Sequence, residues 1–117
     1  MTIEEMFGDL CRIDILAEKR EANEVLMILV CNGFIDGSPE TQRALLDKMK
    51  GYLNYTQSEE FQKRYANWPV TLRVTFDEEP DQLVVALLSK CQPWADDYGV
   101  NLEFEIGGKQ VLFVEQS

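Results

Sequence analysis

Two segments in the second half of the chain alternate strictly between apolar and polar residues. Apolar side chains occupy every second position from Val70 to Phe76, and again from Val100 to Ile106. A period of two residues is typical of a β-strand that packs one face on a core and turns the other to water. We therefore predict two strands here. Their polar faces carry Thr71, Arg73, Thr75, Asn101, Glu103 and Glu105.

Three further segments have weaker strand patterns. From Arg12 to Glu18, the residues Ile13, Ile15 and Ala17 share one side, and Arg12, Asp14 and Glu18 share the other. The stretch from Glu24 to Asn32 is apolar on both faces, and we expect it to form an antiparallel hairpin with the first segment. Gly107 and Gly108 suit a two-residue turn, after which Gln110 to Glu115 would return as a last strand.

Two long helices are predicted between these strands. Ser38 followed by Pro39 is a favourable helix start, and this helix should run to about Thr56. Its expected buried stripe is Leu45, Leu46, Met49, Tyr52 and Leu53, with Arg43, Asp47, Lys48 and Lys50 opposite. The second helix should follow Asp81 and bury Leu83, Val84, Leu87, Leu88 and Cys91. Pro93 should kink or end it, unless Trp94 to Tyr98 adds one more turn.

Two short helices complete the prediction. Thr2 and Glu5 have the spacing of a capping box, and Ser58 can cap a helix that carries Phe61 and Tyr65. The whole chain, residues 1–117, then reads as a single α+β domain of order β-β-α-β-α-β-β. We expect a mostly antiparallel five-stranded sheet with the two long helices on one face.

The other face of this sheet is predicted to be open and mostly polar, with Asp14 and Glu18 on it. The strand 24–32 and the segment 111–114 both carry more apolar residues than one buried face requires. The N-terminal segment, a second copy or a partner could cover this excess.

Composition restricts the classes of partner. Apolar residues make up 45% and charged residues 27% of the chain, as in an ordinary globular domain. Eleven basic residues face twenty-one acidic ones, which gives a formal net charge of -10. Such a charge opposes binding to nucleic acids and to anionic membranes. Acidic surfaces favour solubility, and they also suit a basic protein partner.

Several catalytic and metal-binding classes lack the residues that they need. The chain has no histidine, and its cysteines Cys11, Cys31 and Cys91 show no CxxC spacing. These facts exclude zinc fingers and Cys-His or Ser-His nucleophiles, and we expect no cofactor and no metal. The cysteines are expected in the core. The N-terminus lacks the pattern of a signal peptide, and no apolar run could cross a bilayer, so we expect a cytoplasmic protein.

Three acidic motifs have both a functional and a structural interpretation. The cluster Asp77, Glu78, Glu79 and Asp81 could bind Ca²⁺ or Mg²⁺, but acidic residues are also favoured at a helix start. Asp96 and Asp97 raise the same question at a helix end. The carboxylates of Glu103 and Glu105 should project about 7 Å apart from one strand face. Paired carboxylates can act as acid and base, although a solvated face explains them as well.

Aromatic residues gather near the predicted helix ends. Trp68 and Tyr55 lie outside the main apolar stripes, so they are the candidates for a contact with a partner. The set also includes Tyr52, Tyr65, Trp94 and Tyr98, and we expect half of the six residues to close the ends of the core.

Several segments together resemble a family of small bacterial proteins that share a domain of unknown function. The resemblance rests on Ile13-Asp14-Ile15-Leu16, EVLMILV, LLDKMKGYLNY, VTLRVTF and GVNLEFEI, and it extends to about Ile106. The Gly107-Gly108 hairpin is then an addition. In style such proteins are similar to acidic, single-domain immunity proteins that neutralise bacterial toxins. The resemblance transfers no catalytic residue.

The sequence favours a protein-binding module, most concretely an immunity-type inhibitor of a basic toxin domain. The residues expected to contact the partner are Asp14, Trp68, Glu103 and Glu105. A homodimer or other homo-oligomer with a structural or regulatory role is the alternative. An enzyme that uses carboxylates alone or with Mg²⁺ is the third hypothesis, and the module is expected not to be an enzyme.

Overall fold

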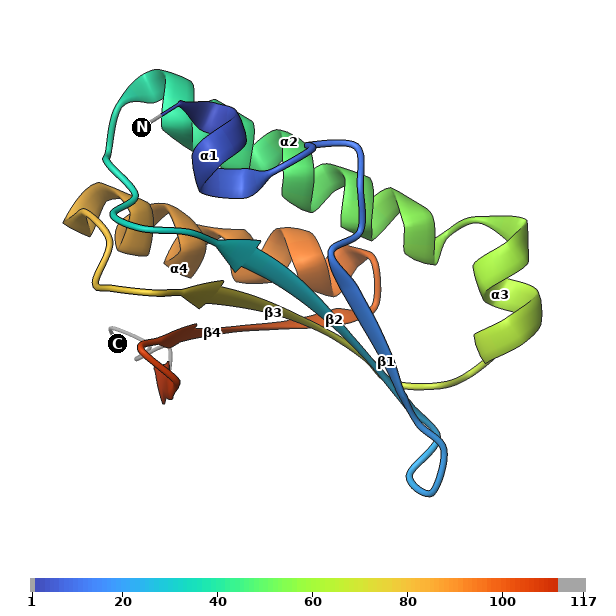
Figure 1. Cartoon of the computed structure of the whole chain (residues 1–117). Helices are drawn as coiled ribbons and strands as arrows, with labels where there is room; N and C mark the ends of the chain where they lie inside the picture. The colour runs from blue at the N-terminus through green and yellow to red at the C-terminus, as the bar shows by residue number, and fades with distance from the viewer. Residues whose placement is uncertain (1, 112–117) are drawn as a thin grey trace.

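The computed structural model describes residues 2–111, and these residues form a sheet covered by helices (Figure 1). In chain order the elements are α1 (Ile3–Phe7), β1 (Ile15–Lys19), β2 (Glu24–Cys31), α2 (Pro39–Thr56), α3 (Glu59–Tyr65), β3 (Val70–Phe76), α4 (Gln82–Asp97), β4 (Val100–Ile106) and β5 (Lys109–Val111). The α+β class is therefore as predicted. The expected last strand begins one residue earlier, and its part from residue 112 onward lies outside the described residues.

The sheet is mixed rather than mostly antiparallel. Its strands lie in the order β1-β2-β3-β4-β5. The outer pairs β1–β2 and β4–β5 are antiparallel, whereas β2–β3 and β3–β4 are parallel. The prediction of a mostly antiparallel sheet is wrong in the three central strands.

Helical connections explain the parallel pairing. A helix links β2 to β3 and another links β3 to β4, and a strand that returns through such a crossover lies parallel to the one before it. From β2 to β3 to β4, each strand is added on the same side of the one before it. Two crossovers of the same hand then place their helices on the same face of the sheet. The long helices α2 and α4 do lie together on one face of the sheet, as expected (Figure 1).

The core lies between this face and the helices. Val70, Leu72, Val74 and Phe76 of β3 are all buried, and so are Val100, Leu102 and Phe104 of β4, which confirms the predicted alternation. In β2 the helix-facing residues are Val25, Met27, Leu29 and Cys31. Leu26, Ile28 and Val30 face the open side, where Leu26 is buried and Ile28 and Val30 are partly exposed.

The helix starts follow the capping residues seen in the sequence. Ser38 Oγ accepts the Thr41 N–H (3.2 Å), Ser58 Oγ accepts the Phe61 N–H (3.2 Å), and Asp81 Oδ1 accepts the Leu83 N–H (2.9 Å). Helix α4 continues through Pro93 to Asp97, so the extra turn is formed and the helix does not end at the proline.

Two helix positions differ from their predicted faces. Lys48 was expected on the outer face of α2, but it is completely buried. It follows Leu45 by three residues and precedes Tyr52 by four, and this spacing places it on the inner face. Leu83 was expected in the buried stripe of α4, but it is 57% exposed. The buried stripe is Val84, Leu88, Cys91 and Ala95.

The side chains of β1 lie on the opposite faces of the sheet to those predicted. Leu16 pairs with Met27 and Glu18 pairs with Val25, so both lie on the helix-covered side. Ile15 and Ala17 lie on the open side, where Ile15 is 45% exposed. The prediction took the side of Ile13 and Ile15 as the buried face, although the apolar Leu16 lies on the other side. Because successive side chains point to opposite faces, this choice placed every residue of the strand on the wrong face.

Candidate functional site

Arg73 lies between the two carboxylates that were predicted on the open face of the sheet. Its Nε donates to Glu103 Oε1 at 2.6 Å, and its Nη1 lies 3.5 Å from Glu105 Oε1. Arg73 is directly opposite Glu103 in the register of β3 and β4. Glu103 and Glu105 are on the predicted face, but a cation of the same chain already engages them, which weakens their attraction for a basic partner.

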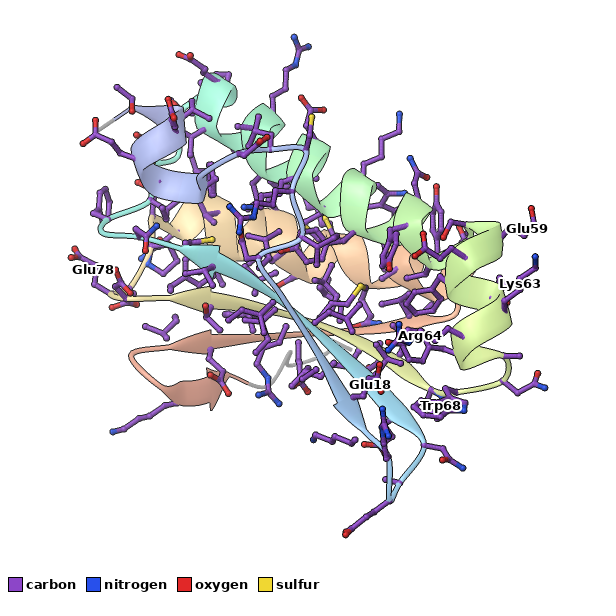
Figure 2. The ribbon with its side chains drawn as sticks, turned by 45° about the vertical axis from the view of Figure 1, so that its right-hand side comes forward. Glu18, Glu59, Lys63, Arg64, Trp68 and Glu78 are labelled. Atoms are coloured by element: carbon purple, nitrogen blue, oxygen red, sulfur yellow. The ribbon has the colours of Figure 1, made fainter. Side chains whose placement is uncertain are left out.

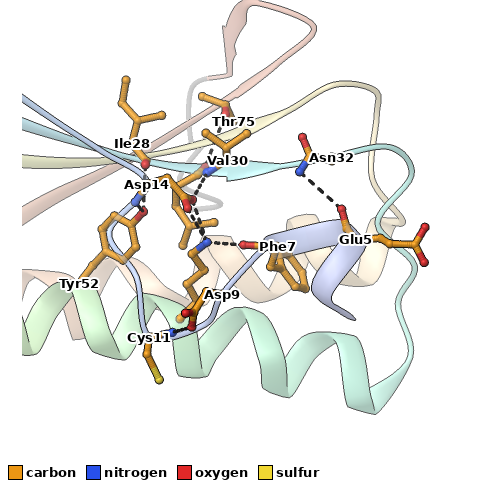
Figure 3. Close-up of polar contacts among 12 residues, drawn as sticks. Glu5, Phe7, Asp9, Cys11, Asp14, Ile28, Val30, Asn32, Tyr52 and Thr75 are labelled. Carbon is orange, nitrogen blue, oxygen red and sulfur yellow. Dashed lines mark hydrogen bonds and ion pairs between the residues drawn. The ribbon is translucent and has the colours of Figure 1, made fainter. Parts of the chain in front are cut away.

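Asp14 is part of a polar network beneath the helices rather than on the open face (Figure 3). Its Oδ2 lies 2.8 Å from Nζ of Lys48 and accepts the Val30 N–H at 3.0 Å. Lys48 Nζ also donates to the carbonyl oxygen of Phe7, at the end of α1. The predicted placement of Asp14 is therefore wrong, because β1 begins at Ile15 and the side chain before it turns back toward α2.

The Tyr52 hydroxyl extends this network to the edge of the hairpin. It accepts the Asp14 N–H at 2.7 Å and donates to the Ile28 carbonyl at 3.0 Å (Figure 3). Burial raises the pKa of the phenol well above its ordinary value. Tyr52 therefore stays protonated and joins the backbone of β2 to the chain that enters β1, which is a structural function.

Trp68 lies at the other end of the sheet, in the connection before β3. It is half-buried, and it closes a row of rings with centroids 5.4, 4.9 and 5.3 Å apart. The row runs through Tyr55, Phe61, Tyr65 and Trp68. Glu18 lies beside it, where it accepts the Tyr65 hydroxyl at 2.5 Å and pairs with Arg64 at 2.9 Å (Figure 2). The hydrogen bond from Tyr65 lowers the pKa of Glu18.

The four predicted contact residues do not share one surface. Asp14 is on the helix side of the sheet, Glu103 and Glu105 are on the open side, and Trp68 is at the end where β3 begins. The role of these residues as partner contacts stays a prediction.

The carboxyl ends of the parallel strands bring two loops together. We call residues 32–38, after β2, and residues 77–81, after β3, the carboxyl-end loops. Asp77 Oδ2 accepts the Gly33 N–H at 2.9 Å, and the Ile35 carbonyl accepts the Asp81 N–H at 3.0 Å. In open α/β sheets the ligand site lies at this end of the strands where the strand order reverses, whereas the order of this sheet does not reverse.

The acidic cluster at residues 77–81 has two kinds of member. Asp77 and Asp81 make hydrogen bonds within the fold. Asp77 accepts the Gly33 N–H, and Asp81 caps the start of α4. Glu78 and Glu79 are both exposed, and Figure 2 shows Glu78 at the end of the molecule opposite to α3. The sequence singled out the cluster, but it gave no sign that the loop after β2 lies against it, because that contact depends on the parallel pairing of β2 and β3.

The cysteines divide between core and surface. Cys31 and Cys91 are buried as predicted, and burial raises the pKa of both thiols. Cys11 is exposed, so its predicted core position is wrong. It lies in the turn between α1 and β1, where Asp9 accepts its backbone N–H at 2.8 Å.

Two structural features are absent from residues 2–111. In that range, no three His, Cys, Asp or Glu side chains come together as potential ligands of a metal ion. No helix in the same range is long and apolar enough to span a bilayer.

Comparison of the chain with profiles of known protein families, with curated proteins and with solved structures gave no match.

Proposed function

We propose that the chain is a protein-binding module whose carboxyl-end loops recognise a basic protein. The observation that carries the proposal is the convergence of acidic residues at this end of the sheet, where Glu78 and Glu79 are exposed. Within a formal net charge of -10, this is a local concentration of negative potential. Complementary potentials steer encounter and select partners.

The pairing of basic side chains elsewhere supports this assignment. Arg73 is held between Glu103 and Glu105, Arg64 pairs with Glu18, and Lys48 is buried against Asp14. These cations are engaged within the molecule by acidic residues outside the carboxyl-end loops. The acidic character of the loops is therefore retained for an external cation.

Binding alone would be sufficient for the function of such a module. An inhibitor of the immunity type covers the working surface of its target and needs no catalytic group of its own. The resemblance to acidic bacterial immunity proteins leads to the same proposal, with a toxin domain as the basic partner. The cytoplasmic location expected from the sequence stays a prediction.

Two matched charge reversals test the proposal. The variant Glu78→Lys/Glu79→Lys changes the pair at the carboxyl-end loops, and Glu59→Lys/Glu60→Lys changes an adjacent pair at the start of α3. Glu78 and Glu59 lie at opposite ends of the molecule (Figure 2). All four side chains are exposed. Each protein is used as bait in the native cell lysate, and the retained proteins are eluted with rising salt and identified by mass spectrometry.

We expect the wild type and the Glu59→Lys/Glu60→Lys variant to retain one basic protein. The Glu78→Lys/Glu79→Lys variant should lose it. Its elution should require more salt from the wild type than from any weakened variant, because salt screens exposed charges. Equal retention by both reversals would remove the carboxyl-end loops as the binding surface. Retention of no basic protein by the wild type would contradict the function itself.

A homo-oligomer is the second candidate, and the open face of the hairpin favours it. Ile15 is 45% exposed there, beside the partly exposed Ile28 opposite it on β2. Copies of net charge -10 repel each other, so association should strengthen as salt rises. The molar mass in solution, measured by light scattering at low and high salt, decides this point. A monomer at every concentration in both salts would dismiss it.

A further inference from the structure

Two large apolar side chains are exposed side by side with the acidic residues of the carboxyl-end loops. Phe34 in the loop after β2 is 46% exposed, and Leu83 in the first turn of α4 is 57% exposed. Together with Glu79, Pro80, Asp81 and Gln82 they line an open groove of about 580 Å³. Fixed apolar groups in a groove are typical of the centre of a protein interface, where they fit an anchor side chain of the partner.

The backbone on both sides of the groove is held in place. Ile35, next to Phe34, is fully buried, and its carbonyl accepts the Asp81 N–H at 3.0 Å. Asp81 in turn caps α4 through the Leu83 N–H. A groove fixed in this way loses little conformational entropy when a partner enters it.

The charge around the groove specifies the flanks of that partner. Residues 32–42 and 77–89 contain six acidic residues and no Lys or Arg. The acidic residues are Asp36, Glu40, Asp77, Glu78, Glu79 and Asp81. Arg43 and Lys90 directly follow these two ranges, and Lys109 lies beyond the Gly107-Gly108 turn, opposite Ile106. A second copy of the chain would bring like charges together here, which disfavours self-association through this groove.

We propose that the groove between Phe34 and Leu83 binds a partner segment with a leucine, methionine or phenylalanine anchor flanked by lysine or arginine. The anchor fills the apolar centre, and the cations meet the acidic rim. This inference rests on the proposed function, because it names the part of the basic protein that the carboxyl-end loops would recognise. It adds a requirement for an apolar side chain that charge alone does not impose.

Two synthetic peptides separate the apolar requirement from the charge requirement. One has a central Leu-Phe pair with three lysines on each side, and the other has Ala-Ala in place of that pair. Each is titrated into the ¹⁵N-labelled full-length protein and followed by amide chemical shifts. We expect the Leu-Phe peptide to bind at least fivefold more tightly and to shift the amides of residues 33–35 and 79–84.

Three serine variants identify the surface. Phe34→Ser and Leu83→Ser should each reduce the affinity for the Leu-Phe peptide to that for the Ala-Ala peptide. Ile15→Ser is the matched control, because Ile15 is equally exposed but lies on the open face of the hairpin, and it should leave both affinities unchanged. Thermal unfolding checks that the variants are folded, since exposed substitutions of this kind change stability little.

Each remaining outcome overturns the inference in a distinguishable way. Equal binding of both peptides at the acidic loops would remove the apolar anchor and leave the charge-based function standing. Preferential binding of the Leu-Phe peptide that Ile15→Ser abolishes would move the site to the hairpin. Binding of neither peptide would reject the groove, and the lysate experiment with the charge reversals would still decide the proposed function.

Discussion

Nζ of Lys48 lies 2.8 Å from Oδ2 of Asp14, and no part of the Lys48 side chain is exposed to solvent. The pair connects helix α2 to the chain that enters β1, and the Phe7 carbonyl adds the end of α1 to the same cation. Helix α2 is thus joined at one charged atom to two points of the N-terminal segment, Phe7 and Asp14, which precede Lys48 by 41 and 34 positions. Asp14 therefore belongs to the internal structure of the fold.

Replacing Asp14 with Ala should destabilise the protein by about 3–5 kcal/mol, because the buried ammonium of Lys48 loses its counter-charge. The free energy of unfolding is measured by urea denaturation. The double variant Asp14→Ala/Lys48→Met should recover part of the loss, since no unpaired charge is left inside. A loss below about 1 kcal/mol for Asp14→Ala would show that the network is not a major contribution to stability.

Tyr52→Phe should cost about 1–3 kcal/mol, because the Asp14 N–H and the Ile28 carbonyl lose their shared partner while the ring remains. Urea denaturation again gives the free energy. Tyr55→Phe is the matched control, since Tyr55 is the partly exposed tyrosine one turn further along α2. Equal effects of the two substitutions would contradict the bridging role of the Tyr52 hydroxyl.

Stability should decrease as the pH rises above about 9 to 10. Burial raises the pKa of the Cys31 thiol above its ordinary value of 9.0 and that of the Tyr52 phenol above 10.0. The folded protein then holds these protons more tightly than the unfolded chain does. The resulting stabilisation is complete below pH 9 and is lost progressively at higher pH. Urea midpoints between pH 7 and 11 measure this, and the slope above pH 10 should be smaller in Tyr52→Phe.

The buried faces of β3 and β4 could be predicted because successive residues of each strand alternate between the core and solvent. Each strand has one face on the helices and one open to solvent, so the alternation of Val70, Leu72 and Val74 with polar neighbours is enough. The same holds for the helix starts, where Ser38, Ser58 and Asp81 bond to backbone groups two or three residues away. Local chemistry determines these features, and local sequence reveals them.

The features that depend on distant partners could not be predicted in this way. Two long helices on one face of a five-stranded sheet suggested antiparallel strands, although the helices between β2, β3 and β4 require crossovers and hence parallel pairing. Glu18 faces the helices because Tyr65 and Arg64, 47 and 46 positions later, supply its hydrogen bond and ion pair. The groove at Phe34 and Leu83 needs both the parallel register and the true face of α4, so the sequence pattern alone did not indicate it.

Gly51→Ala should stabilise the protein by about 0.5–1 kcal/mol. Gly51 is exposed within α2, where glycine has an entropic cost relative to alanine. A Cβ added there would meet no heavy atom closer than the Leu10 carbonyl oxygen, at 3.8 Å, so no repacking is needed. Urea denaturation gives the sign directly. A destabilising effect would mean that the segment before β1 packs more closely on α2 than this distance indicates.

Gly37→Ala should have the opposite effect, because Gly37 lies where the two carboxyl-end loops touch. A Cβ at this position would be 2.7 Å from Asp81 Oδ1 and 3.0 Å from the Leu83 Cβ. The same oxygen caps α4, so its displacement should cost about 1 kcal/mol of stability. It should also separate Phe34 from Leu83 and weaken binding of the Leu-Phe peptide. Asp81→Asn keeps a capping oxygen and is the control, since it should retain most of the stability. If Gly37→Ala lowered neither stability nor peptide affinity, the contact between the loops would not be what holds the groove.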